Sequence, residues 1–270
     1  MQSSDSAFGQ SVAQIYESHL VPLLFEPYAR DMIERLAALQ PSNVLEVAAG
    51  TGAVTRAMAS SLPARVAITA TDLNQAMLDR AMERGTSRPV TWRTADALAL
   101  PFDDAQFDAV VCQFGAMFFP DKARGFSEAR RVLVNGGVLL FSVWDRIEEN
   151  EVAYIVTSAL SDRFPADPPS FLRRTPHGYL DRAAIERDLR SAGFTGDIGF
   201  ETVVLQSRAE SPETAAVALC QGSLIRNEIE ARDPSGLAEA TAAATEALRR
   251  RYGDGPVDGR MQAHVVTVRR

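Results

Sequence analysis

An apolar run that ends in a glycine turn, residues 44–52, most constrains what this chain can fold into. The run is typical of a buried strand, and residues 53–62 then have the pattern of a helix. A second apolar run, residues 66–71, ends at Asp72. A strand that feeds a glycine turn brings backbone N–H groups and a helix N-terminus close to a ligand. Because an acid at the end of the second strand binds ribose hydroxyls in nucleotide-binding βαβ units, this arrangement predicts a nucleoside site.

The spacing of the glycines separates two kinds of nucleoside cofactor. A dinucleotide-binding turn needs a third glycine, and Thr55 stands at that position. The chain instead alternates an acid, a small residue and two glycines, namely Glu46, Ala48, Gly50 and Gly52. This pattern resembles motif I of the class I S-adenosylmethionine (SAM)-dependent methyltransferases, although Ala48 replaces the usual glycine. By itself, the turn fits a purely structural strand–helix connection equally well.

Three later segments, residues 94–102, 107–115 and 130–140, continue the same resemblance in chain order. The last of them resembles the R-V-L-x-P-G-G element of the family, with Asn135 in place of proline. Taken together, the four motifs are most similar to small-molecule methyltransferases of the ubiquinone/menaquinone-biosynthesis type. The resemblance covers roughly residues 40–145 and does not fix the substrate.

The resemblance implies SAM as cofactor and S-adenosylhomocysteine as product, and it assigns roles to individual residues. Asp72 would bind the ribose, Leu73 and Met77 would flank the adenine, and the Asp96 carboxylate would meet the adenine amino group. The predicted cofactor-binding residues are Tyr16, Glu46, Ala48, Ala49, Gly50, Gly52, Asp72, Leu73, Met77, Asp96, Ala97 and Gln113.

Apolar runs and helical patterns alternate through the middle of the chain, which predicts an α/β fold with parallel strands and right-handed crossovers. We expect a doubly wound, seven-stranded, mostly parallel Rossmann-like sheet, in which the resemblance places strand seven antiparallel between strands five and six. Expected strands are near 43–48, 66–71, 90–94, 108–113, 137–143, 200–206 and 263–268. Expected helices are 12–20, 22–39, 53–61, 74–84, 121–131, 148–164, 181–192, 212–224 and 236–252.

The domain prediction has three parts. Residues 1–42 would form an N-terminal helical cap, and residues 43–207 with 261–270 the SAM-binding domain. Residues 208–260 would be a helical insertion that serves as a substrate lid or a dimer surface. Ligands of open α/β sheets bind beyond the carboxyl ends of the strands, where the motif residues fall.

Methyl transfer from a sulfonium is an in-line displacement, so the chemistry depends on orientation and exclusion of water and need not leave a catalytic signature. His177, in a polar loop, is the candidate general base. Arg173 and Arg174 could bind an anionic group of the acceptor. Phe114 and Phe118 could form an apolar wall for a flat acceptor, or could pack the next helix. Predicted acceptor contacts are Phe114, Phe118, Arg173, Arg174 and Tyr179.

Composition excludes several functions. A net charge of −7 disfavours a nucleic-acid partner. No stretch reaches the roughly 18 apolar residues of a membrane span, and the first ten residues lack an apolar signal segment. Two cysteines, Cys112 and Cys220, give no disulfide framework, so we expect a reduced, cytoplasmic compartment. The isolated histidines give no zinc spacing, and we expect no metal. A monomer or a homodimer is expected.

The sequence therefore predicts a SAM-dependent methyltransferase acting on a small, flat or lipophilic acceptor. A non-catalytic SAM-binding protein of the same fold is the first alternative, because one fold supports several uses. A nicotinamide-dependent oxidoreductase is a weaker alternative, given Thr55 and the lack of a Tyr-x-x-x-Lys pair.

Overall fold

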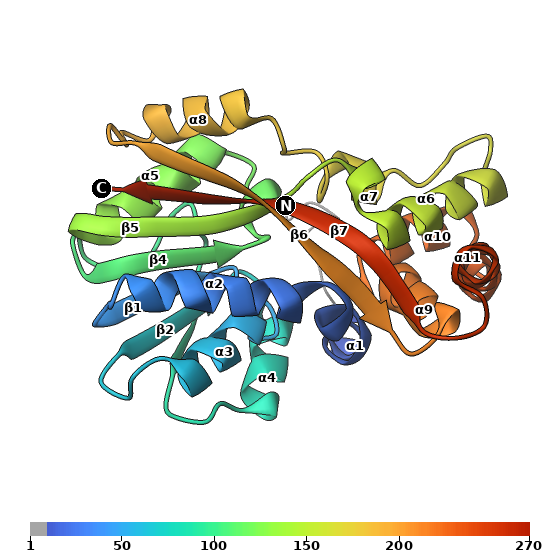
Figure 1. Cartoon of the computed structure of the whole chain (residues 1–270), viewed down its shortest axis with the longest axis horizontal. Coiled ribbons are helices and arrows are strands. Elements are labelled where there is room, and N and C mark those ends of the chain that lie inside the picture. The colour runs from blue at the N-terminus through green and yellow to red at the C-terminus, as the bar shows by residue number, and fades with distance from the viewer. Residues whose placement is uncertain (1–9) are drawn as a thin grey trace. The chain divides into compact units, whose positions relative to one another are not determined.

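A seven-stranded sheet with the strand order β3-β2-β1-β4-β5-β7-β6 organises the chain, as the computed structural model of residues 10–270 shows (Figure 1). The first five strands of that order run parallel, with Val44 of β1 opposite Ile68 of β2 and Ala109 of β4. Strand β7 runs antiparallel to β5, with Val268 opposite Leu139. The predicted fold class, including strand seven between strands five and six, is confirmed.

The elements have the following bounds. The strands are β1 (Asn43–Val47), β2 (Ala67–Asp72), β3 (Thr91–Thr94), β4 (Phe107–Gln113), β5 (Leu133–Trp144), β6 (Ile198–Ala209) and β7 (Val257–Arg269). The α-helices are α1 (Gln10–Ile15), α2 (Glu26–Ala38), α3 (Ala53–Ser61), α4 (Gln75–Arg84), α5 (Lys122–Val132), α6 (Glu151–Arg163), α7 (Phe171–Arg174), α8 (Arg182–Ser191), α9 (Pro212–Gly222), α10 (Ile225–Arg232) and α11 (Leu237–Tyr252). A π-helix, η2 (Tyr16–Phe25), and two 3₁₀ turns, η3 (Ala116–Phe118) and η4 (Ile147–Glu149), complete the set.

The central strands form because their side chains are apolar on both faces, and helices cover those faces. Residues of α2 and α3 pack with β1, β2, β4 and β5 in one buried cluster that includes Met32, Met58 and Val111. Figure 1 shows α2 and α3 on one face of the sheet and α5 and α8 on the other. Each helix that follows a strand therefore returns the chain to the next parallel strand.

Several boundaries differ from the expected ones. Strand β5 begins at Leu133, four residues before the expected start at residue 137. Strands β6 and β7 are 12 and 13 residues long, well beyond the expected 200–206 and 263–268. Pro22 was expected to begin a second helix, but it lies inside η2. A π-helix has a wider turn than an α-helix, and proline has no N–H to donate to the preceding turn, so the irregular helix and the proline occur in the same segment.

The described chain divides into two compact units. One unit contains the sheet core and consists of residues 28–144, 179–203 and 263–270. The other is mostly helical and consists of the N-terminal stretch up to Pro27 with residues 145–178 and 204–262. These boundaries differ from the predicted ones, because residues 145–178 belong with the helices instead of the predicted SAM-binding domain. Of the predicted N-terminal cap, residues 1–9 lie outside the described part of the chain.

Candidate cofactor and acceptor site

The turn after β1 has an unusual backbone. Ala48, Gly50 and Gly52 have φ angles of +56°, +57° and +82°, in the left-handed region that favours glycine. Gly52 is the N-cap of α3 and provides no side-chain cap. Ala48 is thus an alanine in a conformation suited to glycine, at the one motif position where the chain departs from the family pattern. This conformation lets the chain reverse within a few residues and directs its amide groups toward the carboxyl edge of the sheet.

Asp72, the last residue of β2, fixes this turn. One carboxylate oxygen accepts a hydrogen bond from the Gly50 amide (2.8 Å), and the other accepts one from the Asn74 amide (2.8 Å). Burial raises the pKa of Asp72, and these hydrogen bonds act in the opposite direction. A single carboxylate therefore connects the two segments that sequence analysis assigned to the cofactor.

Glu46 lies behind the turn and is almost completely buried. The Thr55 hydroxyl donates a hydrogen bond to its carboxylate (2.5 Å), and the Thr71 hydroxyl donates to its backbone carbonyl (2.9 Å). Burial raises the pKa of Glu46 to about 8, opposed by the Thr55 hydrogen bond and reinforced by the charge of Asp72. Thr55 occupies the place of the third glycine and supplies the hydroxyl that satisfies Glu46, a role that sequence analysis missed.

The loop after β3 brings Asp96 to the same edge of the sheet. The Ala95 amide donates to the carbonyl of Asp72 (2.9 Å), so the loop is joined to the end of β2. The carboxylate of Asp96 accepts from the Leu98 amide (2.9 Å) while Asp96 itself remains exposed. Leu73 is 43% exposed, which is unusual for a leucine beside a buried strand end, whereas Met77 is buried in α4.

These residues fit a bound adenosyl cofactor. The Thr51 hydroxyl in the turn is buried and has no hydrogen-bond partner among the described residues, so it has capacity for a ligand. The exposed Asp96 carboxylate and the exposed face of Leu73 provide one polar and one apolar surface for a base. Ala49, Ala97 and Gln113 also follow strand ends at this edge. The arrangement can therefore hold a ribose and a base, with the rest of the cofactor passing the glycine turn.

The carboxyl ends of β4 and β5 carry a cluster of aromatic rings. Phe114 stacks on Trp144 with ring centroids 3.8 Å apart and planes within 2°, and Tyr28 meets both rings edge-on. All three residues are buried. Phe118, at the end of η3, is only half-buried. Phe114, predicted to contact an acceptor, is therefore engaged in packing on one ring face.

The predicted acceptor-binding loop contains groups that already have partners. Arg173 pairs with Glu148 (2.6 Å) and Arg174 with Glu228 (3.0 Å). Elsewhere, the Tyr179 hydroxyl donates to Asp188 (2.6 Å), and the Lys122 ammonium lies 4.9 Å from the Tyr179 ring centroid. Burial and the neighbouring Asp188 raise the pKa of Tyr179.

His177, the candidate base, lies in the helical unit and is 8% exposed. Its Nδ1 donates to the backbone carbonyl of Asp145 (2.7 Å), which fixes the tautomer. Burial lowers the pKa of His177 to about 4, although the Asp145 hydrogen bond acts in the opposite direction. A group with this pKa is a weak base at neutral pH.

Tyr16, the remaining predicted cofactor residue, belongs to the same helical unit as His177. It begins η2, and its ring stacks on Phe25 with centroids 5.2 Å apart.

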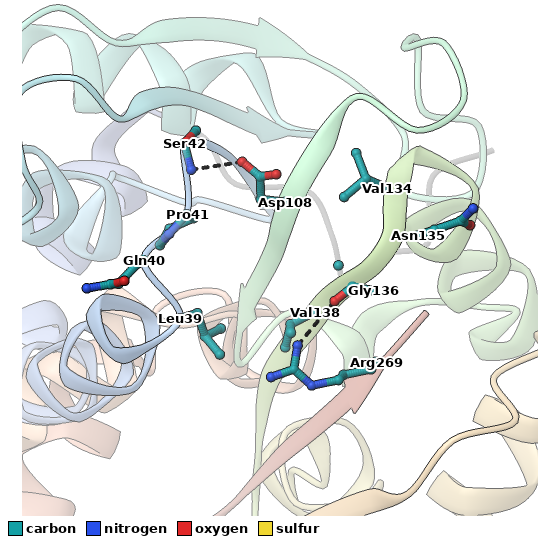
Figure 2. Close-up of a pocket in the computed structure, with 11 residues that line it drawn as sticks. Leu39, Gln40, Pro41, Ser42, Asp108, Val134, Asn135, Gly136, Val138 and Arg269 are labelled. Atoms are coloured by element: carbon teal, nitrogen blue, oxygen red, sulfur yellow. Dashed lines mark hydrogen bonds between the residues drawn. The ribbon is translucent and has the colours of Figure 1, made fainter.

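A hollow of about 290 Å³ lies at the opposite end of the sheet (Figure 2). It is formed where β1, β4 and β5 begin, and none of the predicted site residues lines it. Figure 2 shows the Asp108 carboxylate accepting from the Ser42 amide (2.8 Å) and Arg269 donating to the carbonyl of Gly136 (3.2 Å). These groups join strand ends to loops, and the hollow is separate from the cofactor residues.

Comparison with known proteins agrees with this geometry. A family model described as a methyltransferase domain matches residues 45–141. A ubiquinone/menaquinone biosynthesis C-methyltransferase, UbiE of Cupriavidus necator, is 33% identical over 170 residues, which cover 58% of this chain and 69% of that protein. The chain belongs to the class I SAM-dependent methyltransferases. As a member of this family it is an enzyme that uses SAM as methyl donor.

Solved structures share the fold. Phosphoethanolamine N-methyltransferase 2 of Haemonchus contortus, in complex with phosphomonomethylethanolamine and S-adenosylhomocysteine, matches with a TM-score of 0.62 and 19% identity. The match covers 97% of this methyltransferase and 58% of that chain. The YcgJ protein from Bacillus subtilis matches with a TM-score of 0.54 and 16% identity, covering 90% and 99% of the two chains. At these identities the likeness extends to the fold alone.

Among residues 10–270, no helix combines the length and the apolar character needed to cross a bilayer. Within the same residues, no three His, Cys, Asp or Glu side chains are grouped so that they could hold a metal ion.

Proposed function

We propose that this methyltransferase binds SAM along the carboxyl edge of β1, β2 and β3, with Asp72 as the central contact. The observation that carries the proposal is the hydrogen bond from the Gly50 amide to the Asp72 carboxylate. This bond holds the turn and the end of β2 together, and a carboxylate keeps lone pairs for ribose hydroxyls. Asp96 and Leu73 would then recognise the base, and the Thr51 hydroxyl would bind a polar group near the turn.

SAM supplies a methyl group bonded to a positively charged sulfur. Because that charge is neutralised during transfer, a site gains most by orienting the acceptor and excluding water. The chain thus need not provide a strong base.

We infer that the acceptor is a flat, lipophilic molecule of the quinone type. The names of the curated relatives support this class, as ubiquinone and menaquinone precursors are aromatic rings with apolar tails. The ion pairs of Arg173 and Arg174 with Glu148 and Glu228 also favour an uncharged acceptor, because an anionic one would have to displace a carboxylate. We propose that His177 orients the loop in which it lies and does not abstract a proton.

Calorimetry tests the cofactor site. SAM and S-adenosylhomocysteine should bind the wild type with micromolar dissociation constants, and Asp72→Asn should weaken both by about tenfold or more, since hydrogen bonds to a charged group contribute roughly 1.5–3 kcal/mol. Asp103→Asn, at an exposed loop position, is the matched control. Failure of the wild type to bind either ligand would overturn the proposal.

Turnover tests the acceptor class. The protein is incubated with labelled SAM and a reduced quinone that lacks its ring methyl group, and the product is identified by mass spectrometry. C-methylation adds one methyl group and removes one ring proton. Binding of SAM without transfer to any quinol of a panel would refute the acceptor class.

A further inference from the structure

Three charged residues of α5 hold the loop that carries Asp96. Arg124 donates from Nε to the carbonyl of Leu98 (2.9 Å), and Glu128 accepts from the amide of Leu100 (2.9 Å). Arg131 donates to the carbonyl of Leu100 (2.9 Å). These contacts begin two residues after Asp96. Residues 98–100 of the loop are therefore fixed by side chains of one helix.

Glu128 is the centre of this group and is 4% exposed. Arg131 donates two hydrogen bonds to its carboxylate, at 3.0 and 2.8 Å, and these lower its pKa. A bidentate arginine–carboxylate pair fixes the orientation of both groups. Because the carboxylate keeps its charge while buried, the Leu100 amide has an oriented, charged acceptor.

Arg131 extends the contact along the same loop. It also donates to the carbonyl of Phe102 (2.7 Å) and pairs with Asp104 (2.9 Å). One guanidinium thus binds the loop at three places. Such a fork cannot be reproduced by a lysine, which lacks the planar array of donors.

Two local hydrogen bonds hold Asp96 itself. Its carboxylate accepts from the Leu98 amide, and its backbone carbonyl accepts from the Ala99 amide (3.0 Å). These bonds shape the turn but do not attach it to the rest of the unit. The α5 contacts provide that attachment, together with the bond from Ala95 to the carbonyl of Asp72.

We propose that Glu128, with Arg131 and Arg124, positions the Asp96 loop and so determines recognition of the adenine amino group. The proposal rests on the proposed function, in which Asp96 meets that amino group. Glu128 touches no cofactor atom and acts through the loop, so it is a positioning residue. Its loss should reduce the discrimination between bases more than it reduces the stability of the fold.

The test compares two ligands that differ only at the base. S-adenosylhomocysteine has a 6-amino group, whereas S-inosylhomocysteine has a 6-oxo group that an Asp carboxylate would repel. The wild type should bind the adenine ligand about tenfold or more tightly, as a charged hydrogen bond predicts. In Glu128→Gln this ratio should fall to about threefold or less, because the loop is no longer fixed. Asp96→Asn should reduce the ratio in the same way.

Two further variants separate positioning from folding. Arg124→Gln removes the contact with Leu98 and the ion pair with Glu128 (3.4 Å) from a side chain that is 53% exposed, and leaves the Glu128–Arg131 pair intact. It should fold normally and still lower the discrimination ratio. Arg130→Gln is the matched control, since that guanidinium lies against Gly193 and not against the loop. Thermal unfolding of every variant is measured alongside binding.

The possible outcomes are distinct. If Glu128→Gln and Arg124→Gln discriminate between the two ligands as strongly as the wild type does, the positioning role is overturned. The proposed cofactor site is then unaffected. Equal loss in Arg130→Gln would show a general effect of helix charge and would also overturn it. A wild type that binds neither ligand would instead contradict the proposed function.

Discussion

The methyl group of Ala48 occupies the space that a side chain at Gly115 would need. A Cβ atom built on Gly115 would lie 2.4 Å from the Cβ of Ala48 and 2.8 Å from the Sγ of Cys112. Gly115 has an ordinary φ of −103°, so its backbone would accept alanine and only the contacts forbid it. The departure of this chain from the family glycine at residue 48 is thus coupled to a glycine 67 positions later.

This coupling predicts a compensating pair of substitutions. Gly115→Ala should lower the free energy of unfolding by about 1–3 kcal/mol through overpacking. Ala48→Gly alone should change it by less than about 1 kcal/mol, because relief of the left-handed φ is offset by greater freedom of the unfolded chain. In the Ala48→Gly background, Gly115→Ala should cost less, with the Cys112 contact remaining. Urea unfolding of the four proteins measures the interaction, and strictly additive effects would contradict it.

The buried carboxyl of Glu46 predicts a dependence of stability on pH. The folded protein keeps this proton up to a pKa of about 8, whereas the ordinary pKa of a glutamate carboxyl is 4.5. Between these values the folded state binds more protons than the unfolded state, so the free energy of unfolding falls as pH rises. The contribution of Glu46 to this fall is at most about 5 kcal/mol.

Glu46→Gln should remove this dependence. The amide can still accept from the Thr55 hydroxyl, so stability at pH 5, where little of the pH-dependent loss has occurred, should change by about 1 kcal/mol or less. At pH 9 the variant should be more stable than the wild type. Denaturant unfolding across pH 5–9 measures both, with exposed Glu34→Gln as the control. If Glu46→Gln is less stable than the wild type at pH 9, the folded protein accommodates the ionised Glu46 carboxylate without the expected loss of stability.

Much of the fold could be predicted because its signals are local. Continuous apolar runs indicated the parallel strands, and the helices α4, α5 and α8 begin one residue after the expected positions because Asn74, Asp121 and Asp181 are caps outside the helix. Each of these side chains accepts a hydrogen bond from an amide of the first turn, which is the physical reason such residues begin helices. The type and the order of these elements could therefore be predicted from the sequence.

Other features depend on partners distant in the chain. Strand β7 pairs with β5, a distant segment of the chain, through residues 263–269, and it begins at Val257, six residues before the expected strand. The role of the Thr55 hydroxyl depends on the fold, which buries Glu46 beside it. The ion pairs of Arg173 and Arg174 likewise follow from the placement of α7 in its unit. No local pattern contains this information, so the sequence could suggest these residues but not their partners.

The arginines of α7 provide a test of the acceptor's charge. Arg173→Gln and Arg174→Gln should each change the free energy of unfolding by about 1 kcal/mol or less, because the two arginine side chains are 44% and 45% exposed. If the acceptor is uncharged, its KM should change by less than about threefold in either variant. Steady-state kinetics with a reduced quinone measures this. A KM increase of about thirtyfold in either variant would indicate that an anionic group is recognised.

His177 predicts the opposite pH dependence from Glu46. Its pKa is lowered from 6.5 to about 4 by burial, so the unfolded chain binds a proton that the folded protein does not. The free energy of unfolding should therefore fall as pH decreases from 6.5 to 4, by up to about 3 kcal/mol. His177→Gln should lose this acid dependence, and His19→Gln should retain it. At pH 7, loss of the hydrogen bond to the Asp145 carbonyl should destabilise the variant by about 1–2 kcal/mol.

The same variant distinguishes orientation from base catalysis. General base catalysis contributes about 10²–10⁴-fold to a rate, so loss of a true base would reduce kcat by that factor and abolish one ionisation in the pH–rate profile. An orienting histidine should instead give a reduction of about tenfold or less, with the profile unchanged in shape. The pH–rate profile is measured on both proteins with saturating SAM and a quinol acceptor. Because the pKa of about 4 leaves His177 neutral across pH 6–9, we expect its removal to lower the rate evenly over that range.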